Sequence, residues 1–229
     1  LLAAGSHVIA TGRRADRLHA LSVDLTSERL LTRVLDVREQ ASIDAMLADL
    51  PAPFDAIDIL FNNAGLALGL SKAHEADLDQ WQTMIDTNVS GLVRVTRAVL
   101  PGMVVRNRGD VINMSSVAAS YPYPGGNVYG ATKAFVRQFS LNLRADLLGT
   151  KIRVTSIEPG MADTDFSVVR FNCDQSSADR VYQGVHAMSA DDVALVCEGV
   201  LKLPAHININ SLELMPVQQA FGPFAVNRD

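Results

Sequence analysis

Tyr129 and Lys133 stand four residues apart at the start of a long helical pattern, so both side chains project from one face of the expected helix. A phenol titrates near pH ~10 in water, and an ammonium group beside it favours the ionised form, which lowers the pKa of the phenol. We therefore expect Tyr129 to exchange a proton with a substrate at neutral pH, with Lys133 lowering its pKa. Chance alone gives about 0.07 such pairs in a chain of this composition, so the pair needs support from other residues.

Three further polar motifs follow or interrupt apolar segments. Residues 111–114 form a strand-like run that ends at Ser116, thirteen residues before Tyr129 and across a loop rich in Pro and Gly. In α/β sheets, ligands collect at the carboxyl ends of strands, which is where we expect the Ser116 hydroxyl. An Asn-Asn-Ala-Gly sequence follows a second apolar run at residues 57–61, and Asn88 lies inside a helical pattern.

Together these residues resemble the short-chain dehydrogenase/reductase family, with its tetrad of Asn, Ser, Tyr and Lys and its Asn-Asn-Ala-Gly turn. The resemblance spans residues 8–217. It is strongest, through residues 125–144 and 203–216, to the NADP-dependent branch of the serine, allo-threonine and malonic-semialdehyde type, which acts on small 3-hydroxy acids. It implies a doubly wound, Rossmann-like α/β fold with a parallel sheet, and four catalytic residues: Asn88, Ser116, Tyr129 and Lys133.

Composition favours one domain over residues 1–229, because 48% hydrophobic residues are enough for one sizeable core and nothing marks a second. The net charge of −5 is spread along the chain, which argues against a nucleic-acid or membrane partner. Cys173 and Cys197 lack metal-ligand spacing, so we expect reduced thiols and no metal. No apolar run reaches the ~18 residues of a membrane span, and no basic segment precedes an apolar one at the start, so we expect a cytoplasmic protein.

The first residues read as the end of something longer. Residues 1–5 suggest the last turn of a helix, and residues 7–11 suggest a strand. The resemblance implies an earlier strand and a glycine-rich turn that hold the pyrophosphate of the cofactor, and this sequence contains neither. We expect the natural chain to begin earlier and the two strands beside the missing one to lack a partner. The alternative is a damaged or repurposed member of the family.

Cofactor residues are expected at the ends of several strands. No acid stands at residues 11–14, where an NAD-preferring protein carries one for the ribose, so Arg13 and Arg14 are expected to bind the 2′-phosphate of NADP. Two solvated arginines are the alternative. By resemblance the rest of the cofactor site comprises Asp36 and Val37 at the adenine, Asn63, Ala64 and Gly65 at a ribose, Tyr129 and Lys133, and Pro159, Gly160, Met161 and Thr164 at the nicotinamide.

Two long helices are expected, at residues 78–105 and 127–148. Asn88 is a poor helix former in the first, which hints at a function, although an Asn in a helix is more often a surface residue. By analogy, such helices pair between subunits, which implies a homo-oligomer, either a dimer or a tetramer. Residues 161–190 lack periodicity and fit a flexible lid, where Arg170 is a candidate to bind a substrate carboxylate or is simply solvated. Shorter helices are expected at residues 15–21, 39–50 and 191–203. Strands are expected at residues 30–35, 58–61, 152–157 and 207–214.

The sequence thus predicts an oxidoreductase that transfers a hydride between NADP(H) and a small 3-hydroxy acid or the corresponding carbonyl compound, with Tyr129 as acid/base. Two alternatives stay open. One is an inactive or truncated relative that serves as a subunit or binding module. The other is a nucleotide-sugar epimerase or dehydratase, which also uses Tyr-x-x-x-Lys but normally carries a longer substrate-binding region.

Overall fold

The computed structural model describes residues 1–171 and 174–222. Its main sheet is parallel, with the strand order β3 (Ile59–Asn62), β4 (Gly109–Met114), β5 (Ile152–Pro159) and β8 (Ser211–Leu214). Strands β1 (Val8–Gly12) and β2 (Leu30–Val34) form a separate parallel pair, and β6 (Ala162–Asp163) pairs with β7 (Met188–Ser189). The expected parallel α/β architecture is confirmed.

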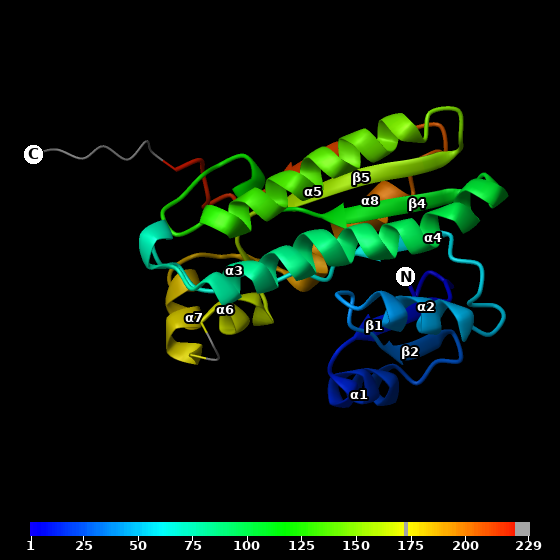
Figure 1. The fold of residues 1–229 in the computed structure, drawn as a ribbon, viewed down its shortest axis with the longest axis horizontal. Coiled ribbons are helices and arrows are strands. Elements are labelled where there is room, and N and C mark those ends of the chain that lie inside the picture. Colours follow the sequence, from blue (N-terminus) through cyan, green and yellow to red (C-terminus); the bar gives the residue numbers. More distant parts are fainter. Residues whose placement is uncertain (172–173, 223–229) are drawn as a thin grey trace, which may run out of the picture.

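Helices cover both faces of the main sheet. Val111 and Val154 point to one face and pack against helices α4 (Leu92–Arg106) and α5 (Asn127–Asp146). Ile112 and Ile157 point to the other face and pack against α8 (Ala190–Leu201). Figure 1 shows α4 and α5 in front of β4 and β5, with α8 behind them. The alternation of side chains along each strand therefore produces the doubly wound arrangement.

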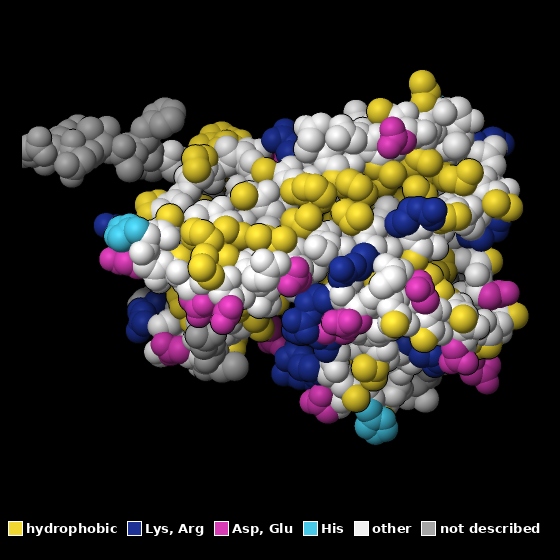
Figure 2. Space-filling view, viewed as in Figure 1, with side chains coloured by type: hydrophobic (Ala, Val, Ile, Leu, Met, Phe, Trp, Pro, Cys, Tyr) yellow, Lys and Arg dark blue, Asp and Glu magenta, His cyan; other side chains and the backbone are white. Residues whose placement is uncertain are grey.

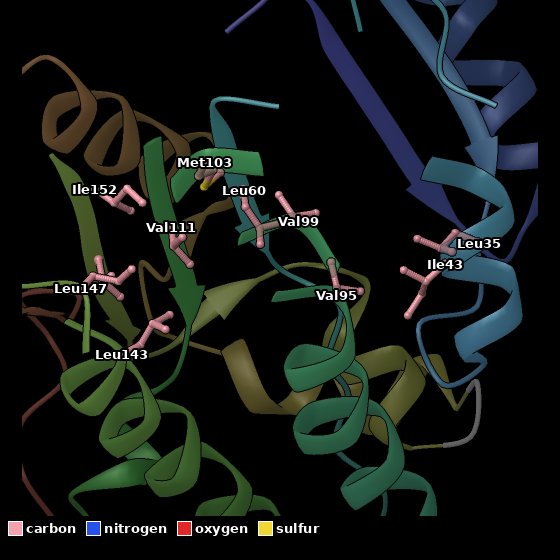
Figure 3. Packing of buried hydrophobic residues seen from close by; sticks show 11 residues of the cluster. Leu35, Ile43, Leu60, Val95, Val99, Met103, Val111, Leu143, Leu147 and Ile152 are labelled. Carbon is pink, nitrogen blue, oxygen red and sulfur yellow. The ribbon is translucent and has the colours of Figure 1, made fainter. Parts of the chain in front are cut away.

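The sheet is interrupted between β1 and β3. Among the described residues, β1 pairs only with β2 and β3 only with β4, as expected for two strands that each lack a neighbour. A cleft of about 1170 Å³ separates them, lined by these two strands, by α4 and by the start of α1 (Ala15–Leu25). In Figure 3, Leu35 of the β2 side and Ile43 of α2 (Gln40–Ala48) lie across this gap from Leu60, Val95 and Val99.

The helix expected over residues 78–105 is present as continuous helical backbone. It consists of α3 (Leu78–Ile85), a π-helical segment (Asp86–Gly91), which the sequence did not predict, and α4. Single π-helical turns occur mostly where a helix serves a function, and this one contains Asn88. Pro101 lies inside α4 without ending it. Short 3₁₀ turns occupy Ala73–Glu75 and Val117–Ala119.

Other corrections concern the ends of the chain and the expected lid. Residues 1–5 form hydrogen-bonded turns, with Gly5 at a positive φ of 89°, and no helix. Residues 161–190 hold two helices that the sequence did not predict, α6 (Asp165–Arg170) and α7 (Gln175–Tyr182). The last strand is shorter than expected, because the Asn208 side chain, rather than a continued strand, binds the backbone of Val154.

Ser189 and Asp192 form a capping box at the start of α8. No helix in the described ranges is both long and apolar enough to cross a membrane. Cys173 and the end of the tail, residues 223–229, lie outside the described residues.

Candidate active site

Ser116 is fixed where β4 leaves the sheet. Its hydroxyl donates to the carbonyl of Pro159 at 3.3 Å and accepts the backbone N–H of Ala118 at 3.1 Å, which starts the following 3₁₀ turn. Just before it, the Ser115 hydroxyl donates to the carbonyl of Lys133 at 2.7 Å. The carboxyl ends of β4 and β5 are therefore tied to each other and to α5, which orients the Ser116 side chain.

Tyr129 and Lys133 lie on the first turns of α5 and are both buried. The Lys133 ammonium is 5.8 Å from the centroid of the Tyr129 ring and donates to the Met114 carbonyl at 2.8 Å. The spacing of the two residues thus brings them together, as the helix period requires. The Met114 carbonyl, at the end of β4, joins Tyr129 and Lys133 as the third member of this group.

The predicted direction of the pKa shift of Tyr129 was wrong. Burial raises the pKa of Tyr129 to about 12, and the Ser116 hydroxyl and the Arg170 guanidinium oppose this rise only in part. Burial also lowers the pKa of Lys133 to about 8. Since both groups are removed from water, desolvation disfavours the charged form of each, and Lys133 is not among the groups that lower the pKa of the phenol.

Two side chains from an element outside α5 lie against the Tyr129 ring. Phe166 of α6 lies 5.6 Å away, centroid to centroid, and the Arg170 guanidinium lies 5.4 Å from the centroid. Arg170 also stacks over Tyr123 at 5.6 Å and donates to its hydroxyl at 2.5 Å. The predicted lid segment therefore contributes a cation and an aromatic ring to the group around Tyr129.

Asn88 holds the Asn-Asn-Ala-Gly turn against α5. Its side chain accepts the N–H of Leu66 at 2.9 Å and donates to the Leu66 carbonyl at 2.8 Å and to the Thr132 hydroxyl at 3.0 Å. A Cβ on Gly65 would lie 3.3 Å from the Asn88 Oδ1 and 3.4 Å from the Lys133 ammonium. The backbone of this turn therefore approaches both side chains closely, and a larger residue at position 65 would require the Asn88 side chain to shift by a few tenths of an ångström.

The amino-terminal cofactor candidates share one site. The cleft between β1 and β3 is lined by Arg13, Arg14, Asp36, Val37, Asn63, Ala64 and Gly65. Asp36 is paired with Arg38 at 2.6 Å, and this hydrogen-bonded arginine is the main cause of the lowered pKa of Asp36. In the described part of the chain, neither Arg13 nor Arg14 forms a salt bridge.

The remaining cofactor candidates lie at the end of β5 or just after it and do not line that cleft. Pro159 ends β5, the Gly160 N–H donates to the Leu214 carbonyl at 2.7 Å, and the Met161 N–H donates to the Gln219 side chain at 2.7 Å. Thr164 caps α6 through its hydroxyl. These backbone contacts fix the segment from Pro159 to Thr164 at the carboxyl end of the sheet.

Sequence reasoning did not single out Tyr123 or Thr132, and it noted Gly91 only as a poor helix former near Asn88. Thr132 is the partner of Asn88, and Tyr123 is the partner of Arg170. A Cβ on Gly91 would lie 2.6 Å from the Val37 side chain, so this glycine sets how closely the π-helical segment approaches the cleft. The usable signal for Tyr123 was an aromatic residue within the Pro/Gly-rich loop that precedes Tyr129.

The fold and the site define a doubly wound α/β protein with a Tyr-Lys pair at the carboxyl ends of its parallel strands. Comparison with known proteins gives the family: the model described as short chain dehydrogenase matches residues 1–173. The chain belongs to the short-chain dehydrogenase family.

Curated relatives cover almost the whole chain. It is 57% identical over 225 residues to the NADP-dependent 3-hydroxy acid dehydrogenase YdfG of Salmonella typhi, covering 98% of this chain and 90% of the relative. It is 54% identical over 225 residues to the serine 3-dehydrogenase of Rhizobium radiobacter, with the same coverage. Among solved structures, the closed form of a serine dehydrogenase complexed with NADP+ has a TM-score of 0.98 and 56% identity, covering 100% of this chain and 92% of the other.

Proposed function

We propose that this chain transfers a hydride between NADP(H) and a small 3-hydroxy acid or the corresponding carbonyl compound. The observation that carries the proposal is the buried Tyr129 phenol, with Ser116, Lys133 and Arg170 as its hydroxyl-bearing or charged neighbours. Similarity to proteins named NADP-dependent 3-hydroxy acid dehydrogenase and serine 3-dehydrogenase supports the same reaction class.

Proton transfer would run through Tyr129. Because its pKa is about 12, the phenol is protonated at neutral pH and can donate to the carbonyl oxygen of a substrate that the Ser116 hydroxyl holds. The nicotinamide ring, when bound, supplies or accepts the hydride. In the oxidation direction, Tyr129 takes the proton of the substrate hydroxyl, and Ser116 and Arg170 favour its ionised form.

Lys133 and Asn88 would support this proton transfer. The Lys133 ammonium lies beside both the Tyr129 ring and the Gly65 turn, so it connects the acid/base to the cofactor side of the site. Asn88 keeps that turn in place through its bonds to Leu66. We assign Asn88 a positioning role, because its side chain bonds to protein groups on both sides.

The cleft fits NADP better than NAD. Arg13 and Arg14 are exposed in it without carboxylate partners among the described residues, which suits a phosphate monoester. Asp36 and Val37 would contact the adenine. The Asn63, Ala64 and Gly65 turn would contact a ribose, and Pro159, Gly160, Met161 and Thr164 would lie at the nicotinamide.

Cofactor titration tests this proposal. Nicotinamide fluorescence should report micromolar binding with NADPH preferred over NADH, and a double substitution of Arg13 and Arg14 by alanine should remove the preference. Arg97→Ala, on an exposed part of α4, is the matched control. Equal binding of both cofactors to the unsubstituted protein would refute the assignment of the arginines. Failure to bind either would refute the proposed function for this chain.

We also propose a homo-oligomer, a dimer or tetramer, that forms through α4 and α5. Figure 2 shows apolar side chains gathered along these helices, and exposed ones include Val104, Val105, Phe135 and Leu148.

Residues 1–229 are proposed to form one domain. A cytoplasmic location is proposed because Cys197 is a free, buried thiol, as is usual in reducing compartments.

A further inference from the structure

Arg170 is the cation in contact with the Tyr129 ring from outside α5. It is the last residue of α6, and its own carbonyl accepts the Gly69 N–H at 3.2 Å, which ties the end of the helix to the loop beyond β3. Its guanidinium is held by Tyr123, through a hydrogen bond to the hydroxyl and stacking over the ring. The charge is therefore held in a defined place, within 5.4 Å of the Tyr129 ring centroid.

No carboxylate of the described residues neutralises this charge. Two other partly buried arginines are paired with carboxylates, Arg38 with Asp36 and Arg153 with Asp110. Arg170 has no salt bridge in the described part of the chain, and its buried Nε has no hydrogen-bond partner there. A guanidinium that is partly removed from water without a counter-ion is costly, unless an anion binds to it during function.

We propose that Arg170 binds the carboxylate of the substrate and that Tyr123 orients its guanidinium for this purpose. The inference rests on the proposed function and adds the group that would make the site selective for acids. In a 3-hydroxy acid, three bonds separate the hydroxyl oxygen from the carboxylate carbon, which is about 3–4 Å. A molecule of this size can place its hydroxyl at Tyr129 and its carboxylate at a guanidinium stacked on the same ring.

The selectivity follows from the chemistry of the pair. A guanidinium binds a carboxylate through two parallel hydrogen bonds, and the ionic pair is stronger in a partly buried site than in water. A neutral substrate of the same shape would leave the charge of Arg170 unpaired. The site should therefore turn over a 3-oxo acid far more efficiently than its amide, and that preference should depend on Arg170.

The test compares NADPH-dependent reduction of acetoacetate with that of acetoacetamide, which has nearly the same shape and no charge. For the unsubstituted protein, kcat/KM should favour acetoacetate by about 100-fold or more. Arg170→Met should raise KM for acetoacetate by about 100-fold and abolish the preference, while the dissociation constant of NADPH stays unchanged. Arg170→Lys should recover part of the preference, and Tyr123→Phe, which keeps the ring, should lose several-fold.

Arg180→Met is the matched control, because Arg180 is exposed on α7 and bonds to Ser177. It should retain the preference of the unsubstituted protein. Thermal denaturation of each variant identifies any that do not fold. If Arg170→Met does not fold, Arg170→Lys and Tyr123→Phe decide the question.

Calorimetric titration with acetoacetate separates this inference from the proposed function. If the unsubstituted protein reduces neither compound, the proposed function fails, and weaker acetoacetate binding by Arg170→Met than by Arg180→Met still supports the carboxylate site. An Arg170→Met variant that keeps the preference for the acid overturns the inference. The inference is also overturned if Arg170→Met loses activity on both substrates equally or loses NADPH affinity instead. It is overturned as well if the unsubstituted protein binds no acetoacetate.

Discussion

Replacing Lys133 with methionine is expected to stabilise the fold while it removes activity. Lys133 is only 6% exposed, and burial lowers the pKa of its amine from 10.5 to about 8. At neutral pH the folded protein must therefore carry a buried ammonium whose only hydrogen bond to a described residue goes to the Met114 carbonyl. Methionine has a similar length and no charge to bury.

The sign of the effect follows from proton binding. Between pH 8 and 10.5 the unfolded chain holds a proton on Lys133 that the folded chain has lost, so stability rises with pH across this window. Below pH 8 the cost of the buried charge is fully present, at about 3 kcal/mol. Loss of the bond to the Met114 carbonyl costs about 1 kcal/mol. The net gain for Lys133→Met at pH 7 is about 2 kcal/mol, which raises Tm by about 4–8 °C.

The assay is urea unfolding of both proteins from pH 7 to pH 10.5, with the matched substitution Lys151→Met at an exposed lysine. Lys133→Met should be more stable at pH 7, and the difference should shrink toward pH 10.5 as the native lysine loses its proton. Lys151→Met should change little at any pH. The reasoning is refuted if Lys133→Met is no more stable than the unsubstituted protein at pH 7, or if its advantage does not depend on pH.

Two more predictions follow from the same site. Tyr129→Phe should lower turnover by orders of magnitude, and a variant with near-normal turnover would contradict the assignment of Tyr129. It should also change alkaline unfolding: a pKa raised from 10 to about 12 contributes stability that is present below pH 10 and lost as pH rises through 12, and phenylalanine lacks this loss. Gly91→Ala should weaken NADPH binding, because its Cβ would meet the Val37 side chain at 2.6 Å, and Val37→Ala should restore part of that binding. Gly199→Ala in α8, where nothing lies within 4 Å of the new Cβ, should leave binding unchanged, and equal loss in both glycine variants would count against the explanation.

The fold was predictable because its signals are local and repeated. Apolar runs of four to eight residues alternate with helical patterns, and this alternation fixes a parallel sheet before any contact is known. The observed ends of helices and strands differ from the predicted ends by one to four residues. Before β8, for example, the Asn208 side chain binds the backbone of Val154 in place of strand pairing. The π-helical segment was missed because Asn88 and Gly91 weaken a helix without specifying which irregular form replaces it.

The helices of the expected lid were missed for a different reason. Helices α6 and α7 have six and eight residues, too few for an apolar period to stand out. Their start signals are capping side chains, Thr164 and Asp174, and such residues occur as often in turns. Short helices of this kind depend on tertiary contacts, such as that of Phe166 with Tyr129, which the sequence does not contain in readable form.

The candidate site also has a part that the sequence predicts and a part that it does not. Tyr129, Lys133 and Ser116 come from a long helix and a central strand, so their spacing could be converted into geometry. The direction of the Tyr129 shift could not, because helical spacing gives the distance between two groups but not how far both are removed from water, and burial here dominates the pKa of each.

The place of Arg170 in the site could not be predicted from the sequence. In the sequence it is one arginine among several, and a solvated role was an equal reading. The fold places it on the Tyr129 ring, ties its backbone to Gly69 and gives its guanidinium a tyrosine hydroxyl as partner. Motifs on regular elements therefore identify the reaction class in this chain, whereas the residues proposed to choose the substrate lie on a short helix and a loop. Substitutions in those segments are the ones expected to change which substrate is accepted while the chemistry at Tyr129 is preserved.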